Sequence, residues 1–477
     1  MILSSNYYTG LFGTDVPAME SLIATALRHG GDYADLFFES TTSKDLLLRD
    51  GEVTSGGFHV DYGVGIRVLK GDKTGYAYSE STRPADMVSA AKAASAIAQG
   101  APETEPYRTH AFAGKPNPAA DRYPVRDDWR LCQADTLVPL LKSLEAKIRA
   151  KDSRVMKVIA MLSSQMSDVM MFNSHLELKY DTRPMGTLAV SVIYGDGKTV
   201  QNSHVSRSWR CGAEMLTESL LDELAEKAVN GISDRLAAKR PKGGKMPVVM
   251  GAGASGILLH EAMGHAFEAD FNRKGQSVFS DMMGRRVCRE GITIVDDATL
   301  RGNRGSLNYD DEGVPGQRTC MVEDGILTSF LHDRVSAAHY GVKPTGNGRR
   351  ESFRFNPIPR MRATYMESGD ANPSDIIASV AKGIYVDEFA NGQVKIGEGD
   401  FTFYVKSGYL IEKGRLTMPV TDINIIGNGP QALADIQAVG NDGLVDESAW
   451  TCGKEQQVPV SCGIPTVLIG SLTVGGE

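Results

Sequence analysis

The residues best suited to chemistry lie in one short segment, His260-Glu261-Ala262-Met263-Gly264-His265. Two histidines beside a glutamate offer two nitrogen ligands for a metal ion and a carboxylate that can take a proton from a bound water. The chain has nine histidines in 477 residues, and this is the one pair that flanks a glutamate. We therefore predict a catalytic zinc site with His260 and His265 as ligands and Glu261 as general base. The alternative is a helix with two incidental histidines and a surface glutamate.

The spacing of the two histidines is one residue longer than in the common H-E-x-x-H zinc motif. Histidines four apart on an α-helix face the same way, whereas histidines five apart diverge by about 140° on an ideal helix. They can share one ion only if the helix contains a local bulge of one residue. Gly264 stands just before the second histidine, where a helix tolerates such a distortion. The sequence thus predicts a bulged helix that begins near residue 255.

A catalytic zinc site needs a third protein ligand and one open position. Four residues qualify by type and place, namely Glu268, Asp270, Cys452 and Cys462. Cys452 lies in a turn-like TCGK stretch, where a neighbouring lysine would favour the thiolate form. Cys462 lies in an apolar stretch that is typical of a buried strand. The residues alone favour Cys452 but leave the third ligand open among these four.

Two further segments could bind a ligand. Residues 251–256 match G-x-G-x-x-G, but the polar, broken sequence after the following helix lacks the second strand and acidic residue of a dinucleotide site. We interpret these glycines as a tight turn into the helix and expect no organic cofactor. Arg349 and Arg350, in a glycine-rich stretch, could bind a substrate carboxylate or a backbone carbonyl. Alternatively, they are solvated residues of a structural loop.

The surrounding elements indicate an α+β fold with a duplication. The order helix, several antiparallel strands, hairpin, helix occurs in residues 1–100 and again in residues 129–238. A Pro-rich connector, 101–128, separates these two units. From residue 239 onward the chain is β- and Gly-rich, and residues 384–426 hold short strands separated by turn residues, as in an antiparallel meander or a barrel. We predict duplicated helix/antiparallel-sheet units in the N-terminal half and a β-rich C-terminal domain, 239–477, that carries the metal-binding helix.

The composition of the chain indicates which kinds of partner and which cellular compartment to expect. The net charge of −8 and the pI of about 5.7 argue against a nucleic-acid partner, which a basic surface would bind. No stretch approaches the roughly 18 apolar residues of a membrane helix, and the first residues lack the pattern of a signal peptide. Six cysteines are scattered through the chain, unlike a disulfide framework. We expect a cytoplasmic protein with reduced thiols and no membrane partner.

Several spaced motifs together resemble the TldD branch of the TldD/PmbA family, formerly called modulators of DNA gyrase. The motifs are HEAMGH at 260–265, PTGNGRRES at 344–352, NPIPRM at 356–361, TCGK at 451–454 and the closing SLTVGGE. The resemblance covers nearly the whole chain in the same order. One departure follows PRM, where Arg362-Ala363-Thr364 stands in place of the Thr-Asn pair expected in the family.

The resemblance implies a cytoplasmic zinc metalloprotease that degrades short or unfolded polypeptides. It also implies a dimer, either with a PmbA-type (TldE) subunit or with a second copy. Carried onto this sequence, the metal ligands are His260, His265 and Cys452, and the base is Glu261. The alternative is a non-catalytic, peptide-binding scaffold subunit of the same kind of complex, which would lack the glutamate and the histidines.

Overall fold

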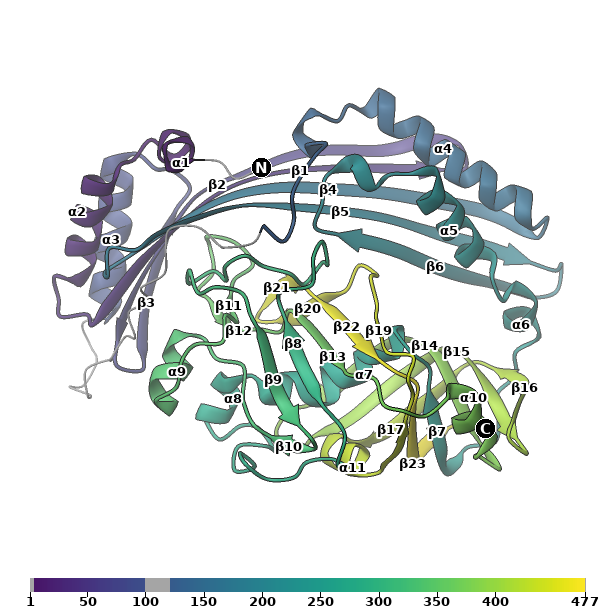
Figure 1. Ribbon diagram of the computed structural model, residues 1–477. Coiled ribbons are helices and arrows are strands. Elements are labelled where there is room, and N and C mark those ends of the chain that lie inside the picture. The colour runs from purple at the N-terminus through teal and green to yellow at the C-terminus, as the bar shows by residue number, and fades with distance from the viewer. Residues whose placement is uncertain (1–3, 99–120, 477) are drawn as a thin grey trace.

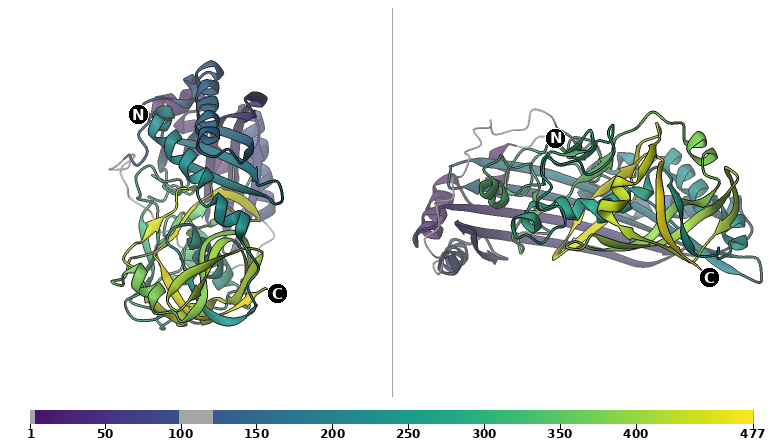
Figure 2. Two further views of the ribbon diagram at one scale, coloured as in Figure 1. Left: turned by 90° about the vertical axis from the view of Figure 1, so that its right-hand side faces the viewer. Right: turned by 90° about the horizontal axis from the view of Figure 1, so that it is seen from below.

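The computed structural model describes residues 4–98 and 121–476. A long arched sheet lies over a β-rich C-terminal region, which occupies the concave side of the arch (Figure 1). Figure 2 shows the same two layers end-on and from below. Among the described residues, no helix is long and apolar enough to cross a membrane. Residues 101–120 of the predicted connector lie outside the described residues.

The arched sheet has the strand order β3-β2-β1-β4-β5-β6. The first strands of the two halves, β1 and β4, pair antiparallel along most of their length. The two predicted units are therefore the two halves of one continuous sheet. The strands are β1 (Tyr33–Arg49), β2 (Glu52–Lys70), β3 (Lys73–Ser79), β4 (Val155–Asn173), β5 (Leu178–Gly195) and β6 (Val200–Trp209).

Helices flank the two ends of this sheet (Figure 1). One end carries α1 (Ser5–Phe12), α2 (Val16–Leu27) and α3 (Pro84–Ala98), and the other carries α4 (Ala134–Lys151), α5 (Glu218–Val229) and α6 (Ile232–Ala237). The helix–strands–helix order predicted for each half is confirmed. The mixed helix-and-strand fold with a β-rich C-terminal region is confirmed as well, whereas the domain boundaries stay a prediction.

The strands of the sheet are longer than the sequence indicates. The segments 34–40 and 44–49, each of which has the pattern of a short strand, both belong to β1. This strand serves two hydrophobic cores, because Leu36 packs with the helices at one end and Leu48 packs with those at the other. Between them Thr41 hydrogen-bonds to a serine of β4. The polar middle interrupts the apolar pattern without ending the strand.

Five strands of the C-terminal region close into a barrel. Its pairings run from β14 through β7, β23, β17 and β15 back to β14, so the barrel is the correct one of the two predicted arrangements. The strands are β7 (Gly244–Met250), β14 (Lys382–Lys395), β15 (Asp400–Glu412), β17 (Ile423–Asn428) and β23 (Val467–Gly475). Two outer strands, β16 (Arg415–Val420) and β18 (Ile436–Val439), pair with β15 and β23.

A second sheet shares one hydrophobic core with the barrel. Its order is β10-β9-β8-β13-β22-β19, comprising β8 (Ile294–Asp297), β9 (Arg318–Glu323), β10 (Ile326–Leu327), β13 (Ala363–Met366), β19 (Leu444–Val445) and β22 (Ser461–Ile464). Two small ribbons pair β11 (Gly348–Arg349) with β12 (Ile358–Pro359) and β20 (Thr451–Lys454) with β21 (Gln456–Pro459). Short helices complete the region, namely α8 (Ala269–Arg273), α9 (Arg334–Tyr340), α10 (Pro373–Ala378) and α11 (Gly429–Ala434).

Candidate metal centre

One bent helical segment, residues 254–267, follows barrel strand β7 and lies in the shared core. It begins with a 3-10 turn, continues through α7 (Ile257–Leu259) into a π turn (His260–Gly264), and ends in a second 3-10 turn. The N–H of His265 donates to the carbonyl of His260, which is the i→i+5 bond of a π turn. This wider turn brings residues five apart to nearly the same side of the segment. The extra residue between the histidines is thereby accommodated.

Gly264 is required by close packing and not by the distortion of the helix. Its φ of −55° is ordinary helical geometry, which any residue adopts. A Cβ at this position would lie 2.1 Å from Sδ of Met361. A side chain here would therefore push the segment away from residues 359–361, which carry part of the site described below.

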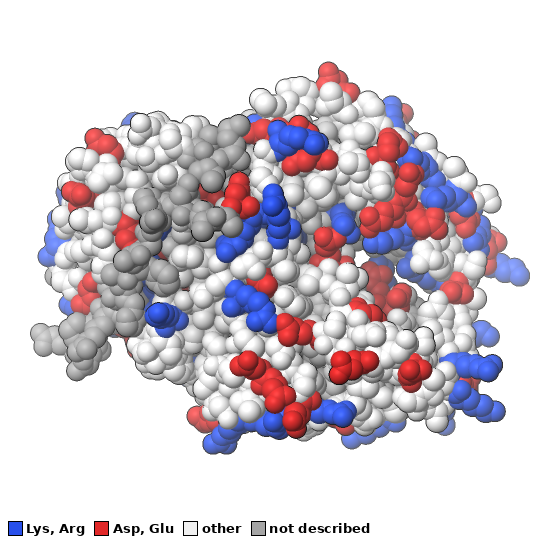
Figure 3. Space-filling view, in the orientation of Figure 1, with Lys and Arg blue, Asp and Glu red and all other residues white. Residues whose placement is uncertain are grey.

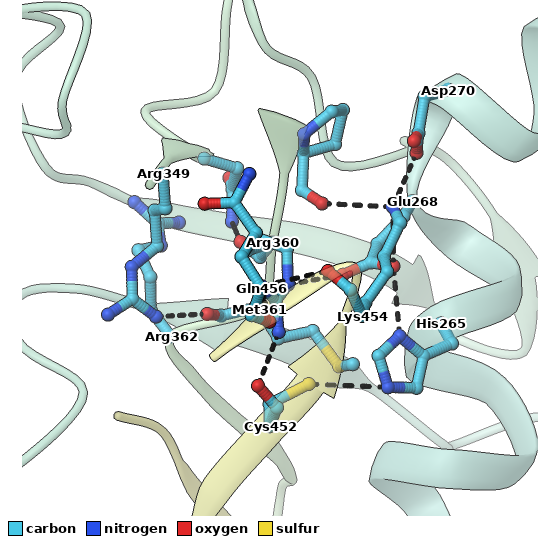
Figure 4. Close-up of polar contacts among 12 residues, drawn as sticks. His265, Glu268, Asp270, Arg349, Arg360, Met361, Arg362, Cys452, Lys454 and Gln456 are labelled. Atoms are coloured by element: carbon cyan, nitrogen blue, oxygen red, sulfur yellow. Dashed lines mark hydrogen bonds and ion pairs between the residues drawn. The ribbon is translucent and has the colours of Figure 1, made fainter. Parts of the chain in front are cut away.

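His260, His265 and Cys452 converge inside this core. Their ligand atoms all lie within 4.8 Å of one another. Sγ of Cys452 is 3.3 Å from Nε2 of His265 (Figure 4), and the two imidazole rings cross at 82° with centroids 5.1 Å apart. All three side chains are buried. The fold thus assembles a compact set of two nitrogen donors and one sulfur donor from distant parts of the chain.

Of the four candidates for the third ligand, all of which are described, Cys452 is the one that joins the two histidines. It lies on the short strand β20 and not in the turn that the sequence indicated. Cys462 lies on β22, where full burial raises the pKa of its thiol well above the usual value. Glu268 and Asp270 instead face Lys454.

The two histidines favour the thiolate form of Cys452. Burial alone would raise the pKa of this thiol, but His260 and His265 lower it to about 4. The thiolate is the form of cysteine that binds metals. Nδ1 of His260 is buried and, within the described residues, has no hydrogen-bond partner. An unpartnered imidazole nitrogen and a thiolate fit a bound cation better than a purely structural core.

A buried carboxylate lies behind His265. Glu268 has no exposed surface, and its Oε2 accepts a hydrogen bond from Nδ1 of His265 at 2.9 Å. Burial alone would raise the pKa of Glu268, but Lys454 and then His265 lower it to about 2. This contact leaves Nε2 of His265 directed at Cys452, as in many metal sites whose histidines are oriented by a carboxylate. Sequence reasoning missed this role, although the three-residue spacing from His265 was visible.

Lys454 and Arg360 connect the β20–β21 ribbon, which carries Cys452, to the carboxylates beside His265. Nζ of Lys454 lies 2.8 Å from a carboxylate oxygen of Asp270. Arg360 has no exposed surface and donates to the backbone carbonyls of Cys452 and Gln456 at 2.6 and 2.8 Å (Figure 4). These bonds fix the backbone of Cys452 relative to the helical segment. The pattern was not visible in the sequence, because its three parts lie far apart in the chain.

Glu261 is the solvent-facing member of the motif. Its side chain is 23% exposed, against 6% for that of His265, and its Oε2 lies 3.9 Å from Nε2 of His265. A carboxylate in this place can hold a water beside the cluster and exchange a proton with it. The structure therefore brings the predicted base next to the predicted ligands.

Arg349 and Arg350 are buried in contacts with the protein itself. Arg349 donates to the carbonyls of Met361 and Pro459 at 2.6 and 2.8 Å. Arg350 donates to the carbonyl of Asp311 at 2.9 Å and lies over an aromatic ring. These contacts give both arginines a structural role. Their predicted role in substrate binding stays a prediction.

The glycines at 251–256 provide a tight turn and close packing. Gly253 has a φ of +85°, in the region that favours glycine. A Cβ at Gly256 would lie 2.5 Å from the backbone nitrogen of Gly463 on β22. The helical segment can therefore start directly against the second sheet, in agreement with the structural interpretation of this stretch.

Comparison with known proteins identifies the class to which this fold and this site belong. Family profiles described as PmbA/TldA metallopeptidase match residues 34–98 (domain 1), 132–236 (central domain) and 243–476 (C-terminal domain). The chain therefore belongs to the PmbA/TldD family of metallopeptidases. Within the family it is similar to a protein named metalloprotease TldD homolog from Haemophilus influenzae, at 40% identity over 451 residues and 93% of each chain.

Two crystal structures share the fold. A candidate modulator of a DNA gyrase from Thermotoga maritima matches with a TM-score of 0.78 and 23% identity, over 96% of this chain and 99% of that one. TldE from Thermococcus kodakarensis matches with a TM-score of 0.74 and 21% identity, over 96% of this chain and 100% of that one. At these identities the likeness concerns the fold alone.

Proposed function

We propose that this protein is a zinc-dependent peptidase, with His260, His265 and Cys452 as zinc ligands and Glu261 as general base. The observation that carries the proposal is the convergence of two imidazoles and a cysteine whose ligand atoms lie within 4.8 Å of one another. Two nitrogens and one sulfur suit Zn²⁺ and leave a fourth position for water or substrate. When bound there, zinc would polarise a peptide carbonyl and lower the pKa of a coordinated water.

The chain's own residues would move the proton and keep the site in shape. Glu261, at the solvent side of the cluster, takes a proton as the peptide carbonyl is attacked and delivers it to the leaving amine. Its oxygen, 3.9 Å from Nε2 of His265, is close enough to share one water with the cluster. Glu268 keeps the ring of His265 in place through the bond to Nδ1, so the ligand is oriented before substrate arrives.

Short or unfolded peptides are the substrates that we infer. A cleft of about 1090 Å³ lies between one end of the arched sheet and the barrel, and Figure 3 shows a hollow between these layers at the right of the molecule. Ala254, the first residue of the helical segment, and Trp450, which precedes β20, both line it. Flexible peptides can enter such a cleft and add a strand to an exposed sheet edge.

We infer a dimer and a cytoplasmic location as part of the same proposal. The partner would be a PmbA/TldE-type subunit or a second copy, which would enclose the cleft and exclude folded proteins. All six cysteines are free thiols, which supports a reducing compartment such as the cytoplasm.

A peptidase assay tests the proposal. Unstructured peptides are incubated with the purified protein as prepared, after removal of metal by a chelator, and after restoration of zinc. We expect cleavage that is lost with the chelator and recovered with zinc. Glu261→Ala should keep stoichiometric zinc and the fold but reduce turnover by about 10²–10⁴-fold. Near-normal turnover in this variant would exclude Glu261 as the base, and peptide binding without cleavage by the zinc-loaded protein would favour the scaffold alternative.

A further inference from the structure

A second polar cavity, about 340 Å³ in volume, lies between the arched sheet and the C-terminal region. Residues of β1, β4 and β5 line it on one side, and Thr451 and residues 457–459 of the β20–β21 ribbon line it on the other. None of the metal ligands is among these lining residues, so the cavity is distinct from the metal centre. Its volume is within the range of small-ligand pockets.

Arginines outnumber acidic residues in the lining of this cavity. Two of the acidic side chains are already engaged: Glu39 accepts from the hydroxyl of Thr41 and the N–H of Phe353, and Asp311 forms an ion pair with Arg183. The cavity therefore has a surplus of positive charge. Its charged lining consists of Arg183, Arg210, Arg304, Arg349 and Arg350 against Glu39, Asp311 and Glu351.

Three of these arginines have only neutral partners. Arg304 donates to the carbonyl of Trp450 at 2.8 Å and to the hydroxyl of Ser208 at 2.6 Å. Arg349 donates to two backbone carbonyls, and Arg210 donates through Nε to the carbonyl of Arg304 at 3.1 Å. In the part of the chain that the structure describes, none of the three forms an ion pair. Both Nη groups of Arg210 also lack a hydrogen-bond partner there, and the guanidinium lies over the ring of Tyr123, 5.7 Å from its centroid.

Positive charge buried without a counter-ion is energetically costly. Arg210, Arg304 and Arg349 are 5%, 8% and 3% exposed, so water compensates them poorly. Burial, and then the charge of Arg210, lower the pKa of Arg304 to about 10 and that of Arg349 to about 9. Both groups nevertheless remain protonated at neutral pH. A fold that retains such a surplus beside an accessible cavity is suited to bind an anion.

We propose that this cavity binds a carboxylate of the peptide substrate, either its free C-terminus or an Asp or Glu side chain. The planar guanidinium fork matches the two oxygens of a carboxylate, and Arg210 has the unengaged donors. Thr451 connects the two sites, since it adjoins Cys452 in sequence, is exposed, and lies 3.2 Å from Nη2 of Arg304. This inference rests on the proposed peptidase function.

The test measures peptide binding apart from cleavage. Fluorescence anisotropy is recorded on the full zinc-loaded chain with Glu261→Gln, which prevents turnover. Four labelled versions of one unstructured peptide are compared: free C-terminus or C-terminal amide, each with an internal Glu or Gln. We expect the versions that retain the recognised carboxylate to bind about tenfold more tightly or better, as for a charge-assisted hydrogen bond. The version that retains affinity tells which carboxylate is recognised.

Variants then assign the carboxylate preference to the cavity. Arg210→Met should abolish the preference while leaving the affinity for the fully neutral peptide unchanged, and Arg210→Lys should restore part of it. Arg83→Met, which removes one exposed charge just before α3, is the matched control and should change neither. Circular dichroism confirms folding of each variant, and Arg210→Lys replaces Arg210→Met if the latter unfolds.

Equal affinity of acidic and neutral peptides, or an equal loss for both in the Arg210 variants, would overturn the assignment. The experiment distinguishes failure of the cavity assignment from failure of the proposed peptidase function. A carboxylate preference in a protein that never cleaves peptides with zinc bound would leave the cavity assignment standing. Cleavage without a preference for carboxylates would support the peptidase function and overturn the cavity assignment.

Discussion

Oε2 of Glu268 lies 2.9 Å from Nδ1 of His265 in a wholly buried contact. The same oxygen is 3.0 Å from Nζ of Lys454, which is two residues from Cys452. One carboxylate therefore connects His265, the proposed ligand on the helical segment, to the ribbon that carries Cys452, the proposed ligand on β20. This geometry makes the arrangement of the proposed ligands depend on a residue outside the proposed ligand set.

Glu268→Gln should weaken zinc binding about 10–100-fold, the usual cost of losing an orienting contact. Glutamine has the same size, but it is neutral and accepts a hydrogen bond from His265 less strongly. Competition with a chromophoric chelator measures the affinity. Glu367→Gln, on the exposed ion pair with Arg318, is the control. Unchanged zinc affinity in Glu268→Gln would show that the contact does not orient the ligand.

Cys452→Ser should lose zinc, whereas Cys462→Ser should retain it. A serine hydroxyl is neutral and hard, so it replaces a thiolate poorly as a zinc ligand. Cys462 is a fully buried thiol outside the cluster, and its substitution tests for a general effect of losing a cysteine from the core. Metal content per chain, measured by mass spectrometry after dialysis, distinguishes the two. Loss of zinc from Cys462→Ser alone would transfer the role to Cys462, and retention by both would point to Glu268 or Asp270.

The residues that converge in the candidate metal centre could be predicted from the sequence, but the residues that hold them in place could not. The spacing of His260 and His265 required a bulge, and a π turn is present at that position. Glu268 was considered only as a ligand, because sequence spacing cannot show which atom of His265 it faces. Arg360 was not predicted at all, since its role is to bond to backbone carbonyls some ninety residues away in the chain.

The arched sheet and the arginine-lined cavity of about 340 Å³ also have features that the sequence shows only in part. Apolar runs located the halves of β1 but not its continuity, because a polar middle such as Thr41 is usual in a loop. No sequence pattern marks Arg210 or Arg304, because an arginine is expected to be solvated. Their burial and lack of counter-ions arise only where the arched sheet meets the C-terminal region.

Asp333→Asn should remove a pH dependence of stability. Asp333 is buried at the start of α9 and accepts the N–H of Ser336 at 2.8 Å, and burial, with help from Glu312, raises its pKa to about 7. Its pKa in the unfolded chain is about 3.9. Between these values the unfolded chain has lost the proton and the folded protein keeps it. The contribution of Asp333 to the free energy of unfolding therefore falls as pH rises from about 4 to 7 and is level above 7.

Asparagine can still accept the helix-capping bond but does not titrate. Denaturant unfolding at several pH values between 4.5 and 7.5 should show a flatter profile for Asp333→Asn than for the unmodified chain. Asp370→Asn, at an exposed aspartate, should leave the profile as it was. A profile that is identical in both variants would show that another group causes the slope.

Substrate selection should follow the conformation of the peptide more than its sequence. The second sheet ends at β19, where Leu444 is 59% exposed and lies close to Gly253 at the start of the helical segment. An extended peptide that pairs with such an edge gains affinity from its backbone, whatever its side chains. Folded proteins offer no free strand. We expect cleavage of unstructured peptides of varied sequence and little action on a stably folded protein.

The measurement is a digest of a peptide pool beside a folded control, with cut sites determined by mass spectrometry. It is run with and without a PmbA-type partner, because a partner that encloses the cleft should raise activity on peptides and leave the folded control intact. A destabilised variant of the same control protein serves as the matched substrate, since it differs in unfolding but hardly in sequence. It should be cut where the parent is spared. Efficient cleavage of the folded parent, or a single strict cleavage motif across the pool, would exclude strand addition as the mode of binding.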